Sequence, residues 1–317
     1  MQTVLRELAT PKFIALYIYL ASVMYMHFRG AERLRFLRQL TEPSGLFAPF
    51  NAVMYAFSKV PSDPILDVED FPELEPLKQN WEVIRDEAKA LQEGGNIRTS
   101  ARHDDLAFVA FYRRGWKRFY LKWYGDALPS AKQLCPRTLE LVNSIPSIKS
   151  AAYTLLPPGG TLGRHRDPYA GSLRYHLGLI TPNSEKCRIF IDGQQHVWHD
   201  GEPVVFDETY VHWAENESDQ VRIILFCDLV RPLYTPIARG LNTLVARTLI
   251  KGTTSRNVET EKVGLFNRLT PWIYKTKMVM TRFKQTRPKL YVAFKVVLNL
   301  GLAYLIFFRG LGLFQGR

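Results

Sequence analysis

The stretch from Ala151 to Val230 constrains the fold most, because it consists of short apolar segments separated by turn residues. A PPGG turn follows the first segment, and five segments have the alternating or continuously apolar pattern of strands: 151–156, 173–181, 188–193, 203–209 and 221–230. Short strands at close spacing, with no helix between them, are typical of antiparallel sandwiches and barrels. The sequence therefore predicts a β-rich core of this kind.

Helical patterns lie on both sides of this core. Apolar residues recur at helical spacing over residues 71–92, and after Pro232 the residues Ile237, Leu241 and Leu244 fall on one face of a further helix. A chain of 317 residues is long enough to bury a sizeable core. We therefore expect an α+β protein with helices flanking the sheets.

The charge of the chain is concentrated in its last part. The net charge is +12, yet the residues from Arg231 onward contain sixteen Lys and Arg against two acids and carry +14. A basic segment of this kind favours an anionic partner, which could be nucleic acid or a membrane surface. The three cysteines form no CxxC pair and are odd in number, which argues against a disulfide framework and favours a reducing compartment.

Two long apolar runs lie near the ends of the chain. The first, 13–28, has Ser22 and His27 as its polar positions, and the second, 290–308, is interrupted by Lys295 and Asn299. At about 1.5 Å per residue the first run would span roughly 24 Å, slightly less than the hydrocarbon core of about 30 Å. Either run alone could be a buried core helix, but the pair together favours a membrane.

Basic residues flank both runs on the side that faces the middle of the chain. Four arginines follow the first run between positions 29 and 38, and six Lys and Arg residues precede the second between positions 275 and 289. By the positive-inside rule, this places everything between the runs in the cytoplasm. A monotopic arrangement, with one or both runs lying in the membrane interface, remains open. Nucleic-acid binding is not expected, because the basic cluster adjoins an apolar helix and no recognition motif accompanies it.

Three residues of the β-rich stretch have the spacing of a metal site. His165 and Asp167 form an HRD motif after the PPGG turn, and His212 follows the segment 203–209. An HxD pair and a histidine one or two strands later can place two imidazoles and one carboxylate on one face of Fe(II), with other positions open for substrate. Because HxD is common by chance, this hypothesis needs support from the residues around it.

Arg222 provides some of that support. Alternation along the last predicted strand places it on the same face as Ile224 and Phe226, so its guanidinium points into an apolar interior. A buried guanidinium needs an anion, which could be a dicarboxylate ligand bound bidentately or a structural ion pair with Asp207 or Asp228.

Arg174 and His176 share a face of the predicted strand 173–181 by the same alternation. They could form a second polar group in the same pocket. Alternatively, they could be the solvent-exposed face of an edge strand.

In order and spacing, several segments resemble the aspartyl/asparaginyl β-hydroxylase family: PPGGTLGRHRD, SLRYHLGLITP, CRIFIDG, EPVVFDETYVHWAENES and VRIILFCDLVRP. The resemblance continues more weakly upstream through FPELEPLKQNWEVIRDEA. It implies a double-stranded β-helix, that is, a jelly-roll or cupin-like core. It also implies an oxygenase that uses Fe(II) and 2-oxoglutarate as cofactors, O2 as co-substrate and, as a stimulant, ascorbate.

This resemblance implies roles for individual residues of the predicted metal site. His165 and His212 match the two metal-binding histidines of the family. The animal peptidyl hydroxylases lack the acid after the first histidine, whereas this chain has Asp167. That departure suggests a complete set of two histidines and one carboxylate here.

Four further positions match residues that contact the co-substrate in the family. Arg222 matches the arginine that binds the distal carboxylate of 2-oxoglutarate, and Arg174 and His176 match an RxHLG element that reaches its other carboxylate. Thr154 falls where the family has a small hydroxyl residue beside the cofactor.

Within the family, the terminal apolar runs and the basic tail resemble those of the bacterial lipid A 2-hydroxylases, which act on C2 of a secondary acyl chain. We thus expect an N-terminal membrane helix in 1–30, a dioxygenase domain in 31–232, and a basic amphipathic region with a membrane helix in 233–317. The enzyme is expected at the bacterial inner membrane, with its catalytic domain in the cytoplasm and lipid A or another membrane lipid as its partner. An ornithine-lipid hydroxylase, a membrane-tethered peptidyl Asp/Asn β-hydroxylase and a non-catalytic cupin-like binding protein are the alternatives.

Overall fold

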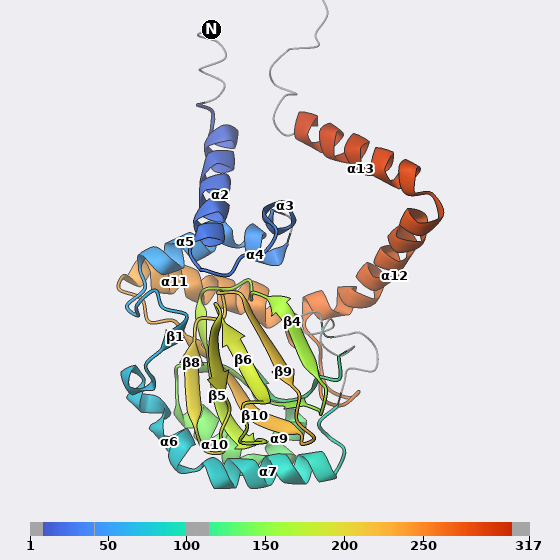
Figure 1. Ribbon diagram of the computed structural model, residues 1–317. Coiled ribbons are helices and arrows are strands. Elements are labelled where there is room, and N and C mark those ends of the chain that lie inside the picture. The colour runs from blue at the N-terminus through green and yellow to red at the C-terminus, as the bar shows by residue number, and fades with distance from the viewer. Residues whose placement is uncertain (1–8, 41, 99–104, 106–113, 306–317) are drawn as a thin grey trace, which may run out of the picture.

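Two antiparallel sheets face each other at the centre of the computed structural model, which describes residues 9–40, 42–98, 105 and 114–305 (Figure 1). The larger sheet has the order β1-β8-β5-β10-β3-β2, and the smaller has the order β4-β9-β6-β7. The strands are β1 (Ile65–Leu66), β2 (Lys117–Trp123), β3 (Ile148–Leu156), β4 (Thr161–His165), β5 (Ser172–Ile180), β6 (Cys187–Ile191), β7 (Gln194–Val197), β8 (Pro203–Phe206), β9 (His212–Asn216) and β10 (Arg222–Val230).

The path of the chain through β3 to β10 is that of a jelly roll. Strands β3, β5, β8 and β10 lie in the larger sheet, whereas β4, β6, β7 and β9 lie in the smaller one, so the chain crosses repeatedly between the sheets. Every strand pair is antiparallel. The predicted jelly-roll core with flanking helices is therefore confirmed.

All five predicted strands are present, but five others were not predicted. Strand β1 has only two residues, and β4, β7 and β9 contain too many polar residues to show an apolar alternation. Strand β2 lies in a segment dense in aromatic and basic residues. These strands form because the central strands of each sheet give them a hydrogen-bonding partner, which outweighs their weak local preference.

Helices cover the outer face of the larger sheet and allow its central strands to be buried on both sides. Strands β5 and β10 are buried along almost their whole length, and α7 packs on β5 while α10 packs on β3. The hydroxyl of Tyr153 in β3 lies 2.6 Å from Thr138 Oγ1 in α10 and joins the two layers. The helices of this layer are α6 (Glu75–Gln79), α7 (Trp81–Glu93), α9 (Pro129–Leu134) and α10 (Pro136–Ser144).

A second group of helices gathers at the opposite end of the jelly roll (Figure 1). It contains α2 (Pro11–Phe28), α3 (Phe36–Gln39), α4 (Pro43–Leu46), α5 (Ala48–Ala56) and α11 (Pro236–Val245). Helices α12 (Leu265–Thr286) and α13 (Pro288–Ala303) extend away from the domain. Many large apolar side chains on these helices are exposed, including Ile18, Ile237, Trp272 and Val297.

The predicted membrane-spanning helices are not supported. Over residues 9–40, 42–98, 105 and 114–305, no helix combines the length and the apolar character needed to cross a membrane. Helix α13 has 16 residues, which at about 1.5 Å each is roughly 24 Å. Helix α2 has 18 residues, but Lys12, His27 and three tyrosines reduce its apolar character.

Candidate functional site

The three residues of the predicted metal site meet between two neighbouring strands. His165 is the last residue of β4 and His212 is the first residue of β9, and the two are register partners. Their ring centroids lie 4.2 Å apart. Asp167 follows two residues after His165, and one ligand atom from each of the three residues lies within 4.8 Å of the others. The strand pairing therefore brings the predicted triad together.

Backbone hydrogen bonds orient both imidazoles in the same way. Nδ1 of His165 lies 2.7 Å from the carbonyl oxygen of Gly163, and Nδ1 of His212 lies 3.0 Å from that of Tyr210. A carbonyl oxygen can only accept, so each Nδ1 carries the proton and each Nε2 keeps its lone pair. This tautomer is the one that metal-binding histidines adopt when their other nitrogen is hydrogen-bonded.

The charge states of the triad also suit a divalent metal ion. Burial, aided by His165, lowers the pKa of His212 to about 3, and burial lowers the pKa of His165 as well, so both rings are neutral at pH 7. Burial raises the pKa of the Asp167 carboxyl, but Arg174 and the two histidines outweigh this effect and lower it overall. Two neutral nitrogens and one carboxylate are the donors that non-haem Fe(II) sites use.

The triad lines one wall of a cavity between the two sheets, which we call the histidine cavity. It encloses about 450 Å³ between the side chains, including its open mouth. All seven predicted site residues line it, namely Thr154, His165, Asp167, Arg174, His176, His212 and Arg222. Ile224, Phe226 and Trp198 supply part of the apolar wall.

Arg222 is a buried cation without an ion pair among the residues that the structure describes. Its side chain is 1% exposed, and its Nε and Nη2 atoms have no hydrogen-bond partner there. Burial lowers its pKa to about 10, and its guanidinium lies 4.5 Å from the ring of Trp198. The alternative of an ion pair with Asp207 or Asp228 is wrong, because both carboxylates pair with other arginines. Its unsatisfied donors fit a carboxylate ligand of the kind that 2-oxoglutarate offers.

Arg174 has the opposite environment, because three carboxylates surround it. Its guanidinium lies 2.9 Å from Asp167, 2.5 Å from Glu208 and 2.9 Å from Asp228. Burial, with help from the neighbouring acids, raises the pKa of Glu208 well above its usual value. Arg174 lies in β5, so its ion pair with Asp167 connects the triad carboxylate to the larger sheet. The contact of Arg174 with 2-oxoglutarate stays a prediction.

Arg174 and His176 are both buried, so the alternative in which they lie on a solvent-exposed face is wrong. Thr154 is buried as well. Neither ring nitrogen of His176 has a hydrogen-bond partner among the described residues. Its ring packs between Phe206 and Phe226, and burial lowers its pKa well below the usual value. A neutral imidazole with free donor and acceptor sites can hydrogen-bond a ligand in the cavity.

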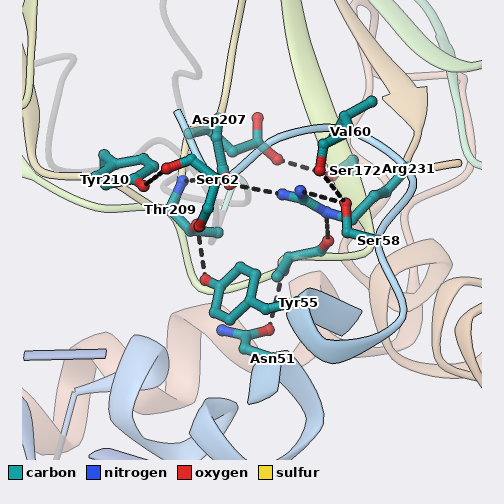
Figure 2. A network of polar contacts seen from close by, with 12 residues as sticks. Asn51, Tyr55, Ser58, Val60, Ser62, Ser172, Asp207, Thr209, Tyr210 and Arg231 are labelled. Carbon is teal, nitrogen blue, oxygen red and sulfur yellow. Dashed lines mark hydrogen bonds and ion pairs between the residues drawn. The ribbon is translucent and has the colours of Figure 1, made fainter. Parts of the chain in front are cut away.

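A network of polar contacts joins residues 51–62 to the loop that leads into His212 (Figure 2). Asp207 pairs with Arg29, which follows α2, at 2.7 Å and with Arg231, which follows β10, at 2.8 Å. The guanidinium of Arg29 lies between the rings of Tyr55 and Tyr210, 4.0 and 4.1 Å from their centroids. The packing of α2 and α5 on the domain thereby fixes the loop between β8 and β9.

Asp207 is expected to govern part of the acid stability. Burial raises the pKa of its carboxyl, but Arg231 and Arg29 outweigh burial and lower it overall. A carboxyl with a lowered folded-state pKa stabilises the fold above its unfolded value of about 4, and this stability is lost as pH falls below about 5. Asp207→Asn should therefore cost about 3–5 kcal/mol near neutral pH, because two buried arginines lose their counter-charge.

Urea unfolding at several pH values tests this expectation. Asp207→Asn should show a smaller loss of unfolding free energy than the wild type between about pH 5 and pH 3. Asp219→Asn, a change at an exposed residue, serves as the control and should match the wild type. Equal pH dependence in the wild type and Asp207→Asn would contradict the expectation.

Sequence reasoning missed two residues of the site and assigned a third the wrong partner. Glu208 and Asp228 complete the cluster around Arg174, and Trp198 packs against Arg222. Asp228 was considered as a partner of Arg222, but it pairs with Arg174 on the neighbouring strand. Neither Glu208, which follows the end of β8, nor Trp198, which follows the end of β7, had a signal in the sequence pattern.

The chain is similar to known proteins in both sequence and structure. The family model for aspartyl/asparaginyl β-hydroxylases matches residues 78–232. The chain is 34% identical over 189 residues to an ornithine lipid ester-linked acyl 2-hydroxylase of Rhizobium tropici. This alignment covers 59% of this chain and 66% of that protein. It is also 27% identical over 168 residues to the human aspartyl/asparaginyl β-hydroxylase. That alignment covers 51% of this chain and 22% of the human protein. The match thus covers less than two thirds of either relative. Among solved structures, a Pseudomonas putida prolyl-4-hydroxylase aligns with a TM-score of 0.32 and 19% identity, covering 49% of this chain and 88% of that one.

Proposed function

Because this chain belongs to the aspartyl/asparaginyl β-hydroxylase family, whose model matches its residues 78–232, we propose that it is an Fe(II)- and 2-oxoglutarate-dependent oxygenase. The observation that carries the proposal is the histidine cavity, where two neutral imidazoles and a carboxylate converge within 4.8 Å. The same cavity contains the buried guanidinium of Arg222, whose Nε and Nη2 have no hydrogen-bond partner in the described part of the chain. A purely structural polar cluster would satisfy its own donors, whereas this one offers donors to a ligand.

The protein residues have separable tasks in this proposal. His165, Asp167 and His212 would hold Fe(II), and Arg222 would bind the distal carboxylate of 2-oxoglutarate. Bound together, the metal, 2-oxoglutarate and O2 supply the oxidation, in which one oxygen atom enters a C–H bond and the co-substrate becomes succinate and CO2. The apolar wall that includes Ile224 and Phe226 would exclude water from that chemistry.

The proposed substrate is an acyl chain of a membrane lipid, most specifically C2 of a secondary acyl chain of lipid A. The similarity to a rhizobial lipid acyl 2-hydroxylase supports the acyl class, and the basic C-terminal region supports an anionic lipid. Ornithine lipid, which is the substrate in that relative's name, is the second candidate.

The proposed place of action is the cytoplasmic face of the bacterial inner membrane. Exposed apolar side chains on α2, α11, α12 and α13 support contact with the membrane interface. Lys and Arg residues close to these helices would face anionic headgroups. An acyl chain within a bilayer can reach the histidine cavity only if the enzyme sits on that bilayer.

Mass spectrometry of lipid A and ornithine lipid tests the proposed function in bacterial cells that express the wild type or His165→Ala. One additional oxygen atom on lipid A, absent with the variant, is the expected result. Oxygen on ornithine lipid instead would keep the chemistry and change the substrate. Turnover of 2-oxoglutarate without any lipid change would indicate a protein substrate, and no turnover at all would favour a non-catalytic cupin-like protein.

A further inference from the structure

A second cavity lies at the end of the larger sheet, and none of its described lining residues also lines the histidine cavity. It encloses about 1160 Å³, including its open mouth, and lies between the end of α10, the ends of β2 and β10, the start of β3, and α11. Among the residues that the structure describes, three cations line it, Lys122, Lys149 and Arg247, and none of the lining residues is Asp or Glu. We call it the cationic cavity.

The positive charge of this cavity is not neutralised within the part of the chain that the structure describes. Nζ of Lys122 donates to Asn143 Oδ1 at 3.2 Å, and Nζ of Lys149 donates to the carbonyl oxygen of Pro146 at 2.8 Å. Both acceptors are neutral. Burial lowers the pKa of Lys122, and Lys149 contributes to the lowering, although Cys227 opposes it.

A fourth cation, Lys251, lies at the edge of the cationic cavity. Its Nζ is 3.2 Å from where a Cβ on Gly125, one of the lining residues, would lie. Several cations that converge on a space without carboxylates form a site for a multiply charged anion, and phosphate is the common biological group of that kind.

Apolar side chains beside Arg247 indicate where such a phosphate would come from. Ile237, Leu241, Leu244 and Leu249 are exposed on α11 and the helical turn that follows it, and Ile237 is 85% exposed. Helix α11 lies at the same end of the domain as α2 and α5 (Figure 1). A free phosphate compound would not need this apolar surface, whereas a lipid presents its phosphate next to hydrocarbon.

The cationic cavity and the histidine cavity lie on either side of one ion-pair cluster. Ser172 lines the cationic cavity and donates a 2.7 Å hydrogen bond to Glu208. Glu208 pairs with Arg174, which lines the histidine cavity. A lipid bound at the cationic cavity would thus be held next to the histidine cavity, which is the candidate site of oxidation.

We propose that the cationic cavity binds a phosphate group of a membrane lipid headgroup. The inference deepens the proposed function and rests on it for the identity of the substrate, because lipid A carries phosphate and ornithine lipid does not. Lys122, Lys149 and Arg247 bind the phosphate oxygens, while the apolar residues of α11 enter the membrane interface.

Vesicle co-sedimentation of the full-length protein tests this proposal without requiring turnover. The vesicles contain phosphatidylcholine with phosphatidic acid, and phosphatidylglycerol at the same surface charge provides the comparison. The test variant is Lys122→Gln/Lys149→Gln/Arg247→Gln. The matched control is Lys89→Gln/Lys132→Gln/Lys186→Gln, which removes the same charge at exposed positions outside the cavity.

The test variant should bind phosphatidic acid vesicles more weakly by about fivefold per removed charge, on the order of 100-fold in total. The control should change by less than about threefold, and the preference of the wild type for phosphatidic acid over phosphatidylglycerol should be lost only in the test variant. Thermal unfolding identifies a misfolded variant, in which case Arg247→Gln, at an exposed position, replaces the triple change.

Three outcomes would overturn the proposal. An equal loss in the test and control variants would indicate diffuse surface charge, and no loss in the test variant would exclude the cavity. Stabilisation by inorganic phosphate without vesicle binding would assign the cavity to a soluble phosphate compound. Succinate formation from 2-oxoglutarate is measured separately, so an inactive enzyme that still binds phosphatidic acid through these residues would refute the proposed function alone.

Discussion

Replacing His212 with alanine is expected to abolish 2-oxoglutarate turnover and to weaken binding of a divalent metal on the order of 100-fold. Structural zinc sites with four ligands bind Zn²⁺ with about 10–16 kcal/mol, and on that scale one ligand accounts for roughly 3 kcal/mol. His212 is buried, and its Nδ1 is fixed by the Tyr210 carbonyl. Its Nε2 is therefore held in place to serve as a ligand.

Titration with Co(II), followed by absorbance, measures this metal affinity directly. His199→Ala is a suitable control, because His199 is outside the histidine cavity. Unfolding free energies measured in parallel show whether the cavity left by the smaller side chain destabilises the fold. Unchanged Co(II) affinity in a folded His212→Ala protein would show that the three convergent side chains are not a metal site.

The triad could be predicted from the sequence because a turn and a strongly patterned segment precede its two histidines, although strands β4 and β9, which contain them, were not predicted. His165 follows a clear turn and His212 follows an apolar strand, so their convergence needed only the correct topology. Arg222 was predicted for a similar reason, since alternation on β10 fixes its face. Local patterns are informative wherever one face of a strand is buried.

The environment of these residues could not be predicted, because it depends on contacts between distant segments. Arg29 and Asp207 are 178 positions apart and meet only after α2 has packed on the domain. The cluster of Arg174 with three carboxylates likewise forms only once β5, β8 and β10 are neighbours. The lengths of the helices at the chain ends also depend on the fold, because α2 begins at Pro11 and a separate helix α13 begins at Pro288.

Arg222→Met is expected to weaken binding of 2-oxoglutarate strongly while leaving the fold equally stable or more stable. Burial lowers the pKa of Arg222 to about 10, which is below the ordinary pKa of an arginine in an unfolded chain. The charged form is thus disfavoured in the folded state at neutral pH, and its removal should raise the unfolding free energy by about 0–3 kcal/mol. Affinity for 2-oxoglutarate should fall on the order of 100-fold, since a bidentate, charge-assisted contact is lost.

Arg174→Met is the matched comparison, because the same substitution on the neighbouring strand should have the opposite effect on stability. It leaves Asp167, Glu208 and Asp228 without their shared cation, at a cost of about 3–5 kcal/mol. Urea unfolding and calorimetric titration of 2-oxoglutarate, with Mn(II) present, measure both quantities for both variants. If Arg222→Met destabilised the protein as much as Arg174→Met does, Arg222 would be a structural cation with a partner in the fold. Its guanidinium would then not be available for a carboxylate ligand, and the assignment of the histidine cavity to 2-oxoglutarate would fail.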